Sequence, residues 1–227
     1  MEKTDATDAL RKLIDDLPDP LAREAFTHAS WSEHRAESYE RLAFLGDSVL
    51  SLAMTTQLFE RSPAQFGAGR LTKVRAQTVS GRACARVAMR LELPDRLAAG
   101  APPEAQAGLD ALVHTERVLA SVIEAAIGAC YSAFGFQRTA SAVVDAFSPE
   151  LEDALDHSVD YKSSLQEALA RRGDVVTYEV IEELGPPHDR TFEVVARIGG
   201  EEAGRGSGRS KKEAEQGAAR AVLESIS

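Results

Sequence analysis

The chain has 227 residues and a formal net charge of −10, with 44% hydrophobic and 27% charged residues. This length is enough for one or two domains with buried cores. We expect no membrane-spanning segment, because no apolar run approaches the roughly 20 residues that one needs. The acidic start "MEKTDATDAL" lacks an apolar signal segment, which favours a cytoplasmic location.

The two cysteines, Cys84 and Cys130, lie far apart in the chain. Their spacing is not that of a metal site, and a disulfide scaffold is unusual for a protein of this size. We therefore expect two buried, reduced thiols.

Residues 1–155 show helical periodicity throughout. Leu42, Leu45, Val49 and Leu52 recur at helical spacing, and residues 70–91 repeat the pattern. Residues 115–134 are apolar on most sides, which predicts a central, buried helix. The pattern predicts an all-α domain over residues 1–155.

The pattern changes after residues 156–160, which we assign to a linker. A short helix over 161–173 ends at Gly173, and three segments rich in strand-forming residues or turns follow at 175–184, 191–200 and 201–208. A closing helix over 210–226 has a small face that would let it lie close on a sheet. Residues 161–227 are therefore predicted to form a small α+β domain of order α-β-β-β-α. Its strand face contains Phe192, Val194, Ala196 and Ile198, and its small helical face contains Ala214, Ala218 and Ala221.

The negative net charge alone argues against a nucleic-acid partner, but phosphate binding needs only a local basic patch. From Ala203 to Lys212 the chain has Arg205, Arg209, Lys211 and Lys212 and no acid. The two lysines are predicted in the first turn of the closing helix, where free backbone N–H groups also favour phosphate.

The segment "GRGSGRSKKEAEQGAARAVL", within the α-β-β-β-α order, resembles the double-stranded RNA-binding domain. Such domains recognise the shape and 2′-hydroxyls of A-form RNA rather than its sequence. The resemblance implies phosphate contacts across the major groove, contacts to one minor groove from the first helix, and contacts to the next from the loop between the first two strands. By this resemblance, Lys211 and Lys212 contact the phosphates across the major groove. Gln166 and Glu167 on the first helix contact one minor groove, and His188 in the loop contacts the next.

Glu40 and Asp47 of "ERLAFLGDSVL" lie seven residues apart, so they share one helical face, with Ala43 between them. The stretch resembles the ribonuclease III signature, which normally has a glutamate at the position of Ala43. Three further blocks resemble that family in the same order, and the layout is that of bacterial ribonuclease III. They are "AFTHASW", "GRLTKVRAQTVS" and "ERVLASVIEAAIGA".

The resemblance implies a Mg²⁺ site, with Mn²⁺ as a substitute, built from clustered carboxylates. Asp47 and Glu124 match two of the four expected acids and are the predicted catalytic and metal-binding residues. The other two positions hold Ala43 and Ser121, and a further frequent glutamate is replaced by Ala68. Glu40 is a candidate additional ligand, as is Ser121 through a bound water.

Two functions remain open. The first is a Mg²⁺-dependent endoribonuclease that cleaves double-stranded RNA in rRNA and mRNA processing, with activity weakened by the missing acids. The second is an inactive dimer that only binds double-stranded RNA. If Asp47 and Glu124 hold no metal, we expect them to pair with an arginine such as Arg41 or Arg75.

The resemblance also implies a homodimer joined through the signature helices, with Phe44 at the interface, although the pattern fits a core position for Phe44 equally well. Several cations of residues 70–91 are candidates for steadying phosphates, or else form a solvated helix face. These are Lys73, Arg75, Arg82 and Arg86.

Overall fold

The computed structural model describes residues 6–63, 66–157, 161–186 and 190–226. The chain divides into two compact units, residues 1–158 and 159–227. The N-terminal unit is helical, as predicted, and the last of its helices continues into the segment expected to be linker. Its helices are α1 Asp8–Asp15, α2 Asp19–Ala25, α3 Glu40–Arg61, α4 Ala68–Thr78, α5 Gly81–Arg90, α6 Leu93–Ala99, α7 Leu109–Val113, α8 Glu116–Phe134, α9 Phe136–Ala146 and α10 Ser148–His157, with short 3₁₀ turns η1 Ala29–Trp31, η2 Arg35–Glu37 and η3 Pro103–Ala105.

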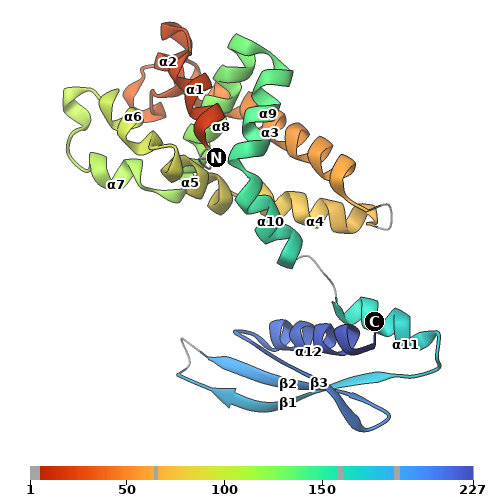
Figure 1. Cartoon of the computed structure of the whole chain (residues 1–227). Coiled ribbons are helices and arrows are strands. Elements are labelled where there is room, and N and C mark those ends of the chain that lie inside the picture. Colours follow the sequence, from red (N-terminus) through yellow and green to blue (C-terminus); the bar gives the residue numbers. More distant parts are fainter. Residues whose placement is uncertain (1–5, 64–65, 158–160, 187–189, 227) are drawn as a thin grey trace, which may run out of the picture. The chain divides into compact units, whose positions relative to one another are not determined.

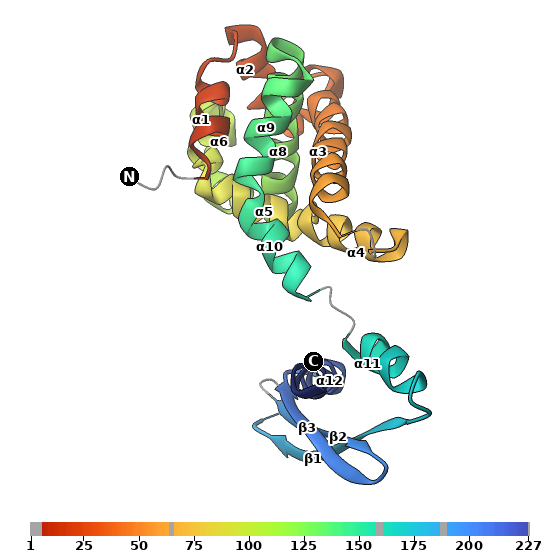
Figure 2. The ribbon, with the colours of Figure 1, turned by 45° about the vertical axis from the view of Figure 1, so that its right-hand side comes forward.

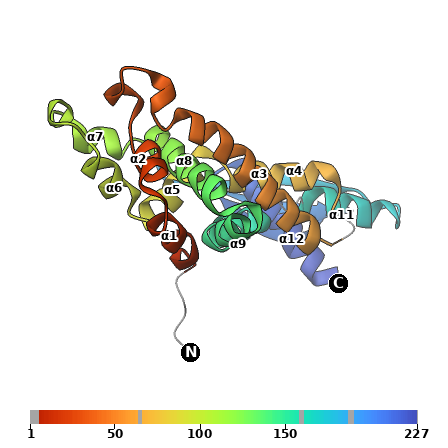
Figure 3. The same cartoon turned by 90° about the horizontal axis from the view of Figure 1, so that it is seen from above.

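Helix α8 is the centre of the N-terminal unit. It packs against α3 and α5 most extensively and also contacts α2, α6 and α9. Seen from above, α8 runs between α3 on one side and α5 and α6 on the other (Figure 3). The central, buried helix predicted over residues 115–134 is confirmed.

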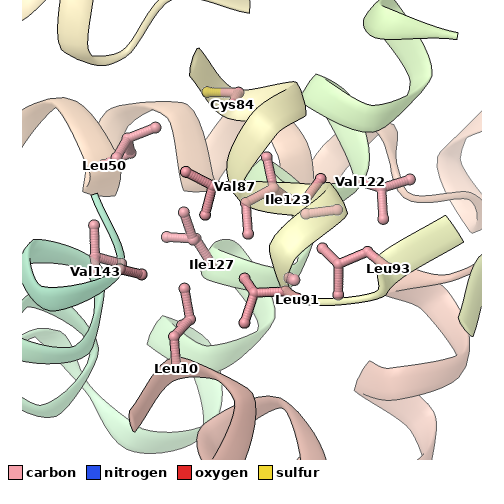
Figure 4. Close-up of a cluster of buried hydrophobic side chains, with 14 of the residues drawn as sticks. Leu10, Leu50, Cys84, Val87, Leu91, Leu93, Val122, Ile123, Ile127 and Val143 are labelled. Atoms are coloured by element: carbon pink, nitrogen blue, oxygen red, sulfur yellow. The ribbon is translucent and has the colours of Figure 1, made fainter. Parts of the chain in front are cut away.

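The core of this unit gathers side chains from α1, α3, α5, α8 and α9 (Figure 4). Leu10, Leu50, Ile123 and Ile127 are fully buried there. Both cysteines are free and buried, as predicted, and burial raises the pKa of each thiol to about 12.

By length and composition alone, helices α3 and α8 are long and apolar enough to cross a membrane. This differs from the expectation that the chain has no apolar segment of that length. Both helices contribute many residues to the core of the N-terminal unit. Core helices of globular proteins pass the same test, so this property is accounted for by their packing.

Two glycines let α3 and α8 cross with their backbones in contact. A Cβ atom on Gly46 would lie 1.7 Å from the backbone oxygen of Glu124, and one on Gly128 would lie 2.2 Å from that of Leu42. No side chain fits at either point, since real Cβ contacts are much longer. The crossing therefore depends on glycine at both positions.

A buried carboxylate ties α10 to α5. Glu150 is 4% exposed and accepts hydrogen bonds from Arg90 at 2.7 and 2.8 Å and from Nε of Arg86 at 3.2 Å. The bidentate geometry and the second guanidinium compensate the loss of hydration.

The C-terminal unit contains α11 Tyr161–Ala170, β1 Val176–Leu184, β2 Thr191–Ile198, β3 Glu201–Gly208 and α12 Lys211–Ile226. This is the predicted α-β-β-β-α order. The strands form one antiparallel sheet in the order β1-β2-β3. Helices α11 and α12 pack together on the same side of that sheet (Figures 1 and 2).

Close packing of α12 on β3 depends on a row of glycines. A Cβ on Gly206 would lie 2.1 Å from the backbone nitrogen of Ala218, and one on Gly204 would lie 2.7 Å from the Val222 side chain. The predicted strand face is confirmed, with Val194 and Ala196 fully buried. The predicted small helical face is corrected at one position, because Ala219 is buried while Ala221 is only half-buried.

We predict that Gly46→Ala lowers the free energy of unfolding by about 3 kcal/mol or more, because the new methyl group must force α3 and α8 apart. Chemical denaturation of the full chain measures this. Gly69→Ala is the matched control, since its Cβ would meet nothing within 4 Å on α4, and it should gain up to about 1 kcal/mol from helix propensity. Equal stability of the two variants would contradict the close crossing.

Candidate active site and nucleic-acid interface

The crossing of α3 and α8 brings Asp47 and Glu124 together. Asp47 directly follows Gly46, and the backbone of Glu124 is the surface against which Gly46 packs. Asp47 is exposed and Glu124 is half-buried. The structure thus juxtaposes the two acids that the sequence predicted as catalytic.

The electrostatics confirm that the two carboxylates interact. Burial is the main cause that raises the pKa of Glu124 from 4.5 to about 7, and the negative charge of Asp47 raises it further. Both acids also raise the pKa of the Cys84 thiol, after burial itself. The pair is therefore a concentration of negative charge at the surface of the core.

Neither acid is neutralised by an arginine. Within the described part of the chain, the side chains of Asp47 and Glu124 form no ion pair, and Arg75 instead donates to the Thr55 hydroxyl at 3.3 Å. Arg41 is exposed and also lacks an ion-pair partner among those residues. The expectation that the acids pair with Arg41 or Arg75 in place of a metal is wrong.

The donor set fits the Mg²⁺ ion that the family resemblance implies. Mg²⁺ prefers hard oxygen ligands, keeps several waters, and is often bound through one or two carboxylates. Asp47 and Glu124 supply two such groups without a competing cation. Among the described residues no group of three or more His, Cys, Asp or Glu side chains gathers to hold a metal.

The positions of the missing acids open onto a pocket of about 570 Å³ beside this pair. Ala43 lies one turn before Asp47 on α3, and Ser121 one turn before Glu124 on α8. Glu40 lines the same pocket, 3.7 Å from Arg35. The role of Glu40 as a metal ligand stays a prediction. Ala68 is exposed at the start of α4.

The candidate phosphate-steadying cations divide into two groups. Arg75 already donates a hydrogen bond to the Thr55 hydroxyl, and Arg86 already donates one to the Glu150 carboxylate. Lys73 and Arg82 are exposed, with no ion-pair partner in the described ranges. Only the second pair is free to meet a phosphate without breaking an existing contact.

In the C-terminal unit, the residues predicted to contact RNA are exposed wherever the structure describes them. Gln166 and Glu167 are exposed on α11, and Lys211 and Lys212 are exposed in the first turn of α12. His188 lies outside the described residues. The first helix and the start of the last therefore present these side chains to solvent.

The start of α12 is already stabilised by its own side chains. The Ser210 hydroxyl accepts from the Glu213 N–H at 3.2 Å, and the Glu213 carboxylate accepts from the Arg209 N–H at 2.8 Å. Lys211 pairs with Glu183 at 3.0 Å. A phosphate at this helix start would therefore meet Lys212 directly and would compete with Glu183 for Lys211.

The described residues thus form a helical unit with two adjacent carboxylates, followed along the chain by an α-β-β-β-α unit whose last helix has a basic start. Comparison with known proteins agrees: the ribonuclease-III-like family model matches residues 18–151, and the double-stranded RNA binding motif matches residues 161–226. The chain belongs to the ribonuclease III family of endoribonucleases.

Curated relatives extend over nearly the whole chain. Ribonuclease 3 of Natranaerobius thermophilus is 35% identical and aligns with 100% of this chain and 98% of its own length. Ribonuclease 3 of Streptomyces coelicolor is 40% identical, with 92% and 76% covered. Among solved structures, the nuclease domain of ribonuclease III from Campylobacter jejuni matches 63% of this chain and 96% of its own, with 27% identity and a TM-score of 0.55.

The sequence pattern did not reveal the two arginines Arg35 and Arg117, which line the same pocket as Ala43 and Ser121. It also missed Gly46 and Gly128 as the cause of the Asp47–Glu124 juxtaposition. A glycine within each of two long apolar helices was the available signal, because glycine is disfavoured in a helix interior unless close packing requires it.

We predict that the metal-free protein loses stability as the pH rises from about 4.5 to about 7, since the folded pKa of Glu124 is raised and the folded state holds that proton more tightly. The contribution is fully present below the unfolded pKa and is lost above the folded one. Glu124→Gln removes it. The difference in unfolding free energy between variant and wild type, measured in EDTA, should therefore increasingly favour the variant up to neutral pH and then level off. Parallel pH profiles for the two proteins would contradict the raised pKa.

Proposed function

We propose that the chain is a Mg²⁺-dependent endoribonuclease that cleaves double-stranded RNA, with Asp47 and Glu124 as its catalytic carboxylates. The observation that carries this proposal is the pair itself: two acids held together by a glycine-dependent helix crossing and left without a cationic partner within the described residues. A charged pair in that condition suits a cation ligand set.

A divalent cation held by the pair would neutralise charge on a phosphodiester and make a water more acidic. The close crossing of α3 and α8 holds the backbones of the two acids next to each other before a cation binds. Lys73 and Arg82 are free cations of the same unit that can contact flanking phosphates. Mn²⁺ suits the same oxygen donors and is expected to substitute.

The second candidate is a dimer that binds double-stranded RNA without cutting it. The observation in its favour is the pair of neutral residues, Ala43 and Ser121, where the family usually has acids. The observation against it is the raised pKa of Glu124. An ionised Glu124 that is partly buried and lies beside Asp47 destabilises the fold, and a bound cation would offset that cost.

Cleavage of a long duplex RNA tests these two functions directly. Purified full-length chain should cut it in Mg²⁺ or Mn²⁺ and not in EDTA, and Asp47→Asn or Glu124→Gln should abolish cutting while duplex binding persists. Glu60→Gln, at an exposed position of the same helix α3, is the matched control and should cut normally. Tight duplex binding without cleavage in either metal would instead establish the binding-only function.

We also propose that the chain forms a homodimer through α3. Phe44, Leu52 and Phe59 are 81%, 53% and 77% exposed, and their spacing of eight and seven residues places them along one side of the helix. The placement of Phe44 in the core is therefore wrong. Such an uncovered apolar stripe is typical of a protein–protein contact.

The oligomeric state tests this surface. Phe44→Asp should shift the full chain from dimer to monomer in sedimentation velocity, because a carboxylate cannot be buried unpaired at an apolar contact. Val175→Asp, at another exposed apolar position that is 73% exposed in the C-terminal unit, is the control and should remain dimeric. A wild-type chain that is monomeric throughout the concentration range would overturn the proposal.

For duplex binding, we propose that Lys211 and Lys212 contact phosphates. Replacing both with alanine should weaken binding to all duplex sequences alike and reduce the slope of log K against log salt by about one to two units. Arg172→Ala, at an exposed cation on the turn after α11, is the control. An unchanged slope in the double variant would place the phosphate contacts elsewhere.

The expected cellular role is processing of rRNA and mRNA precursors in the cytoplasm. The proposal follows from the substrate class, since structured precursors contain the duplex regions that such a protein would cut. RNA sequencing of a deletion strain should show uncut precursors with extended duplex stems. Normal processing in the absence of the protein would contradict this role.

A further inference from the structure

The pocket beside the Asp47–Glu124 pair has a composition of its own. It is enclosed by the first turns of α3 and α8 together with η1 and η2, and has a volume of about 570 Å³. Small-molecule sites typically have volumes of about 300–1,000 Å³, so a nucleotide unit fits. Ala43 and Ser121, the two neutral replacements, form part of its wall.

The charges around this pocket favour an anion. Arg35 and Arg117 both line it, against the single carboxylate of Glu40. The Arg35 side chain is 80% exposed and lies 3.7 Å from Glu40. Arg117 is exposed and has neither an ion pair nor a hydrogen bond to its side chain in the described ranges. Acids at positions 43 and 121 would have reversed this balance.

The pocket also offers a fixed neutral donor. Nδ1 of His28 accepts a hydrogen bond from the Ser30 N–H at 3.1 Å, so in the neutral ring the proton is on Nε2. The ring is held by Trp31 and Tyr39, each with its ring centroid 5.5 Å away.

We propose that this pocket binds a backbone phosphate of the RNA, with its ribose, next to the phosphate that is cut. Arg117 and Arg35 supply the charge, and His28 supplies a neutral donor. The inference rests on the proposed endoribonuclease function and adds a substrate-positioning site to it. Ala43 and Ser121 each precede a catalytic acid by one helical turn, which is about 5.4 Å. That length is similar to the spacing of neighbouring phosphates along one strand.

Trp31 makes the site observable without catalysis. It is the only tryptophan in the chain, and its ring contacts that of the pocket residue His28. In EDTA, a duplex of about 20 base pairs, longer than the roughly 16 that one binding domain spans, should change the Trp31 fluorescence saturably. Labelled-RNA anisotropy measures total binding in parallel.

Arg117→Ala should remove most of the Trp31 change while the anisotropy still reports binding through the C-terminal unit. Arg117→Lys should retain part of the change, because it keeps the charge but loses the guanidinium fork. Arg23→Ala, at an exposed arginine of α2 outside the pocket, is the matched control and should respond as the wild type does. An undiminished Trp31 change in Arg117→Ala would overturn the proposal, as would a change produced by a free nucleoside monophosphate but not by the duplex.

Neutral methylphosphonate linkages identify the phosphate. In Mg²⁺, Arg117→Ala should slow single-turnover cleavage of the natural duplex about ten- to a hundredfold, as expected for one lost charge-assisted contact. It should cause no further slowing on a duplex with a methylphosphonate at one position beside the cut. Equal slowing on every duplex would contradict the assignment.

The outcomes separate this inference from the proposed function. If the wild type cuts normally and Arg117→Ala does too, only this inference fails. A wild type that neither binds nor cuts duplex RNA refutes the proposed function itself.

Discussion

Backbone contact between α3 and α8 is the constraint on which the N-terminal unit depends. Gly46 and Gly128 remove the side chains that would separate the helices, and the close crossing in turn places Asp47 beside Glu124. Burial in this crossing, with a further contribution from the charge of Asp47, raises the pKa of Glu124 to about 7. The packing of α3 on α8 and the charge of the candidate site are therefore coupled, because the same helix crossing buries apolar side chains and brings two carboxylates together. A cation bound between the two carboxylates would offset this destabilisation, because it binds the folded state.

The two units use the same packing solution for different purposes. In the C-terminal unit, Gly204 and Gly206 of β3 let α12 lie directly on the sheet. This holds the start of α12, with Lys212, at a defined position relative to the strands. In the N-terminal unit, glycines position carboxylates, and in the C-terminal unit they position a cation.

Much of this was predictable from periodicity and from resemblance. The strands, the last helix and the central helix all lie within a few residues of their predicted ranges, because burial on one face leaves a regular pattern. Asp47 and Glu124 were identifiable residue by residue. The pairing of Arg86 with Glu150 was not, nor was the presence of Arg35 and Arg117 around one pocket, because each brings together segments far apart in the chain. The choice of Ala219 over Ala221 reflects the exact rotation of α12 on the sheet, which helical spacing alone does not set.

We propose that Asp47 and Glu124 form one cation site even though Ala43 and Ser121 stand where the family usually has acids. Calorimetric titration of Mn²⁺ into the metal-free full chain, at a pH just below the Glu124 pKa of about 7, tests it most directly. We expect saturable binding of one cation per chain, with release of the Glu124 proton. Asp47→Asn should lose this binding, and Glu124→Gln should release no proton. Wild-type binding isotherms and proton release in both variants would contradict it.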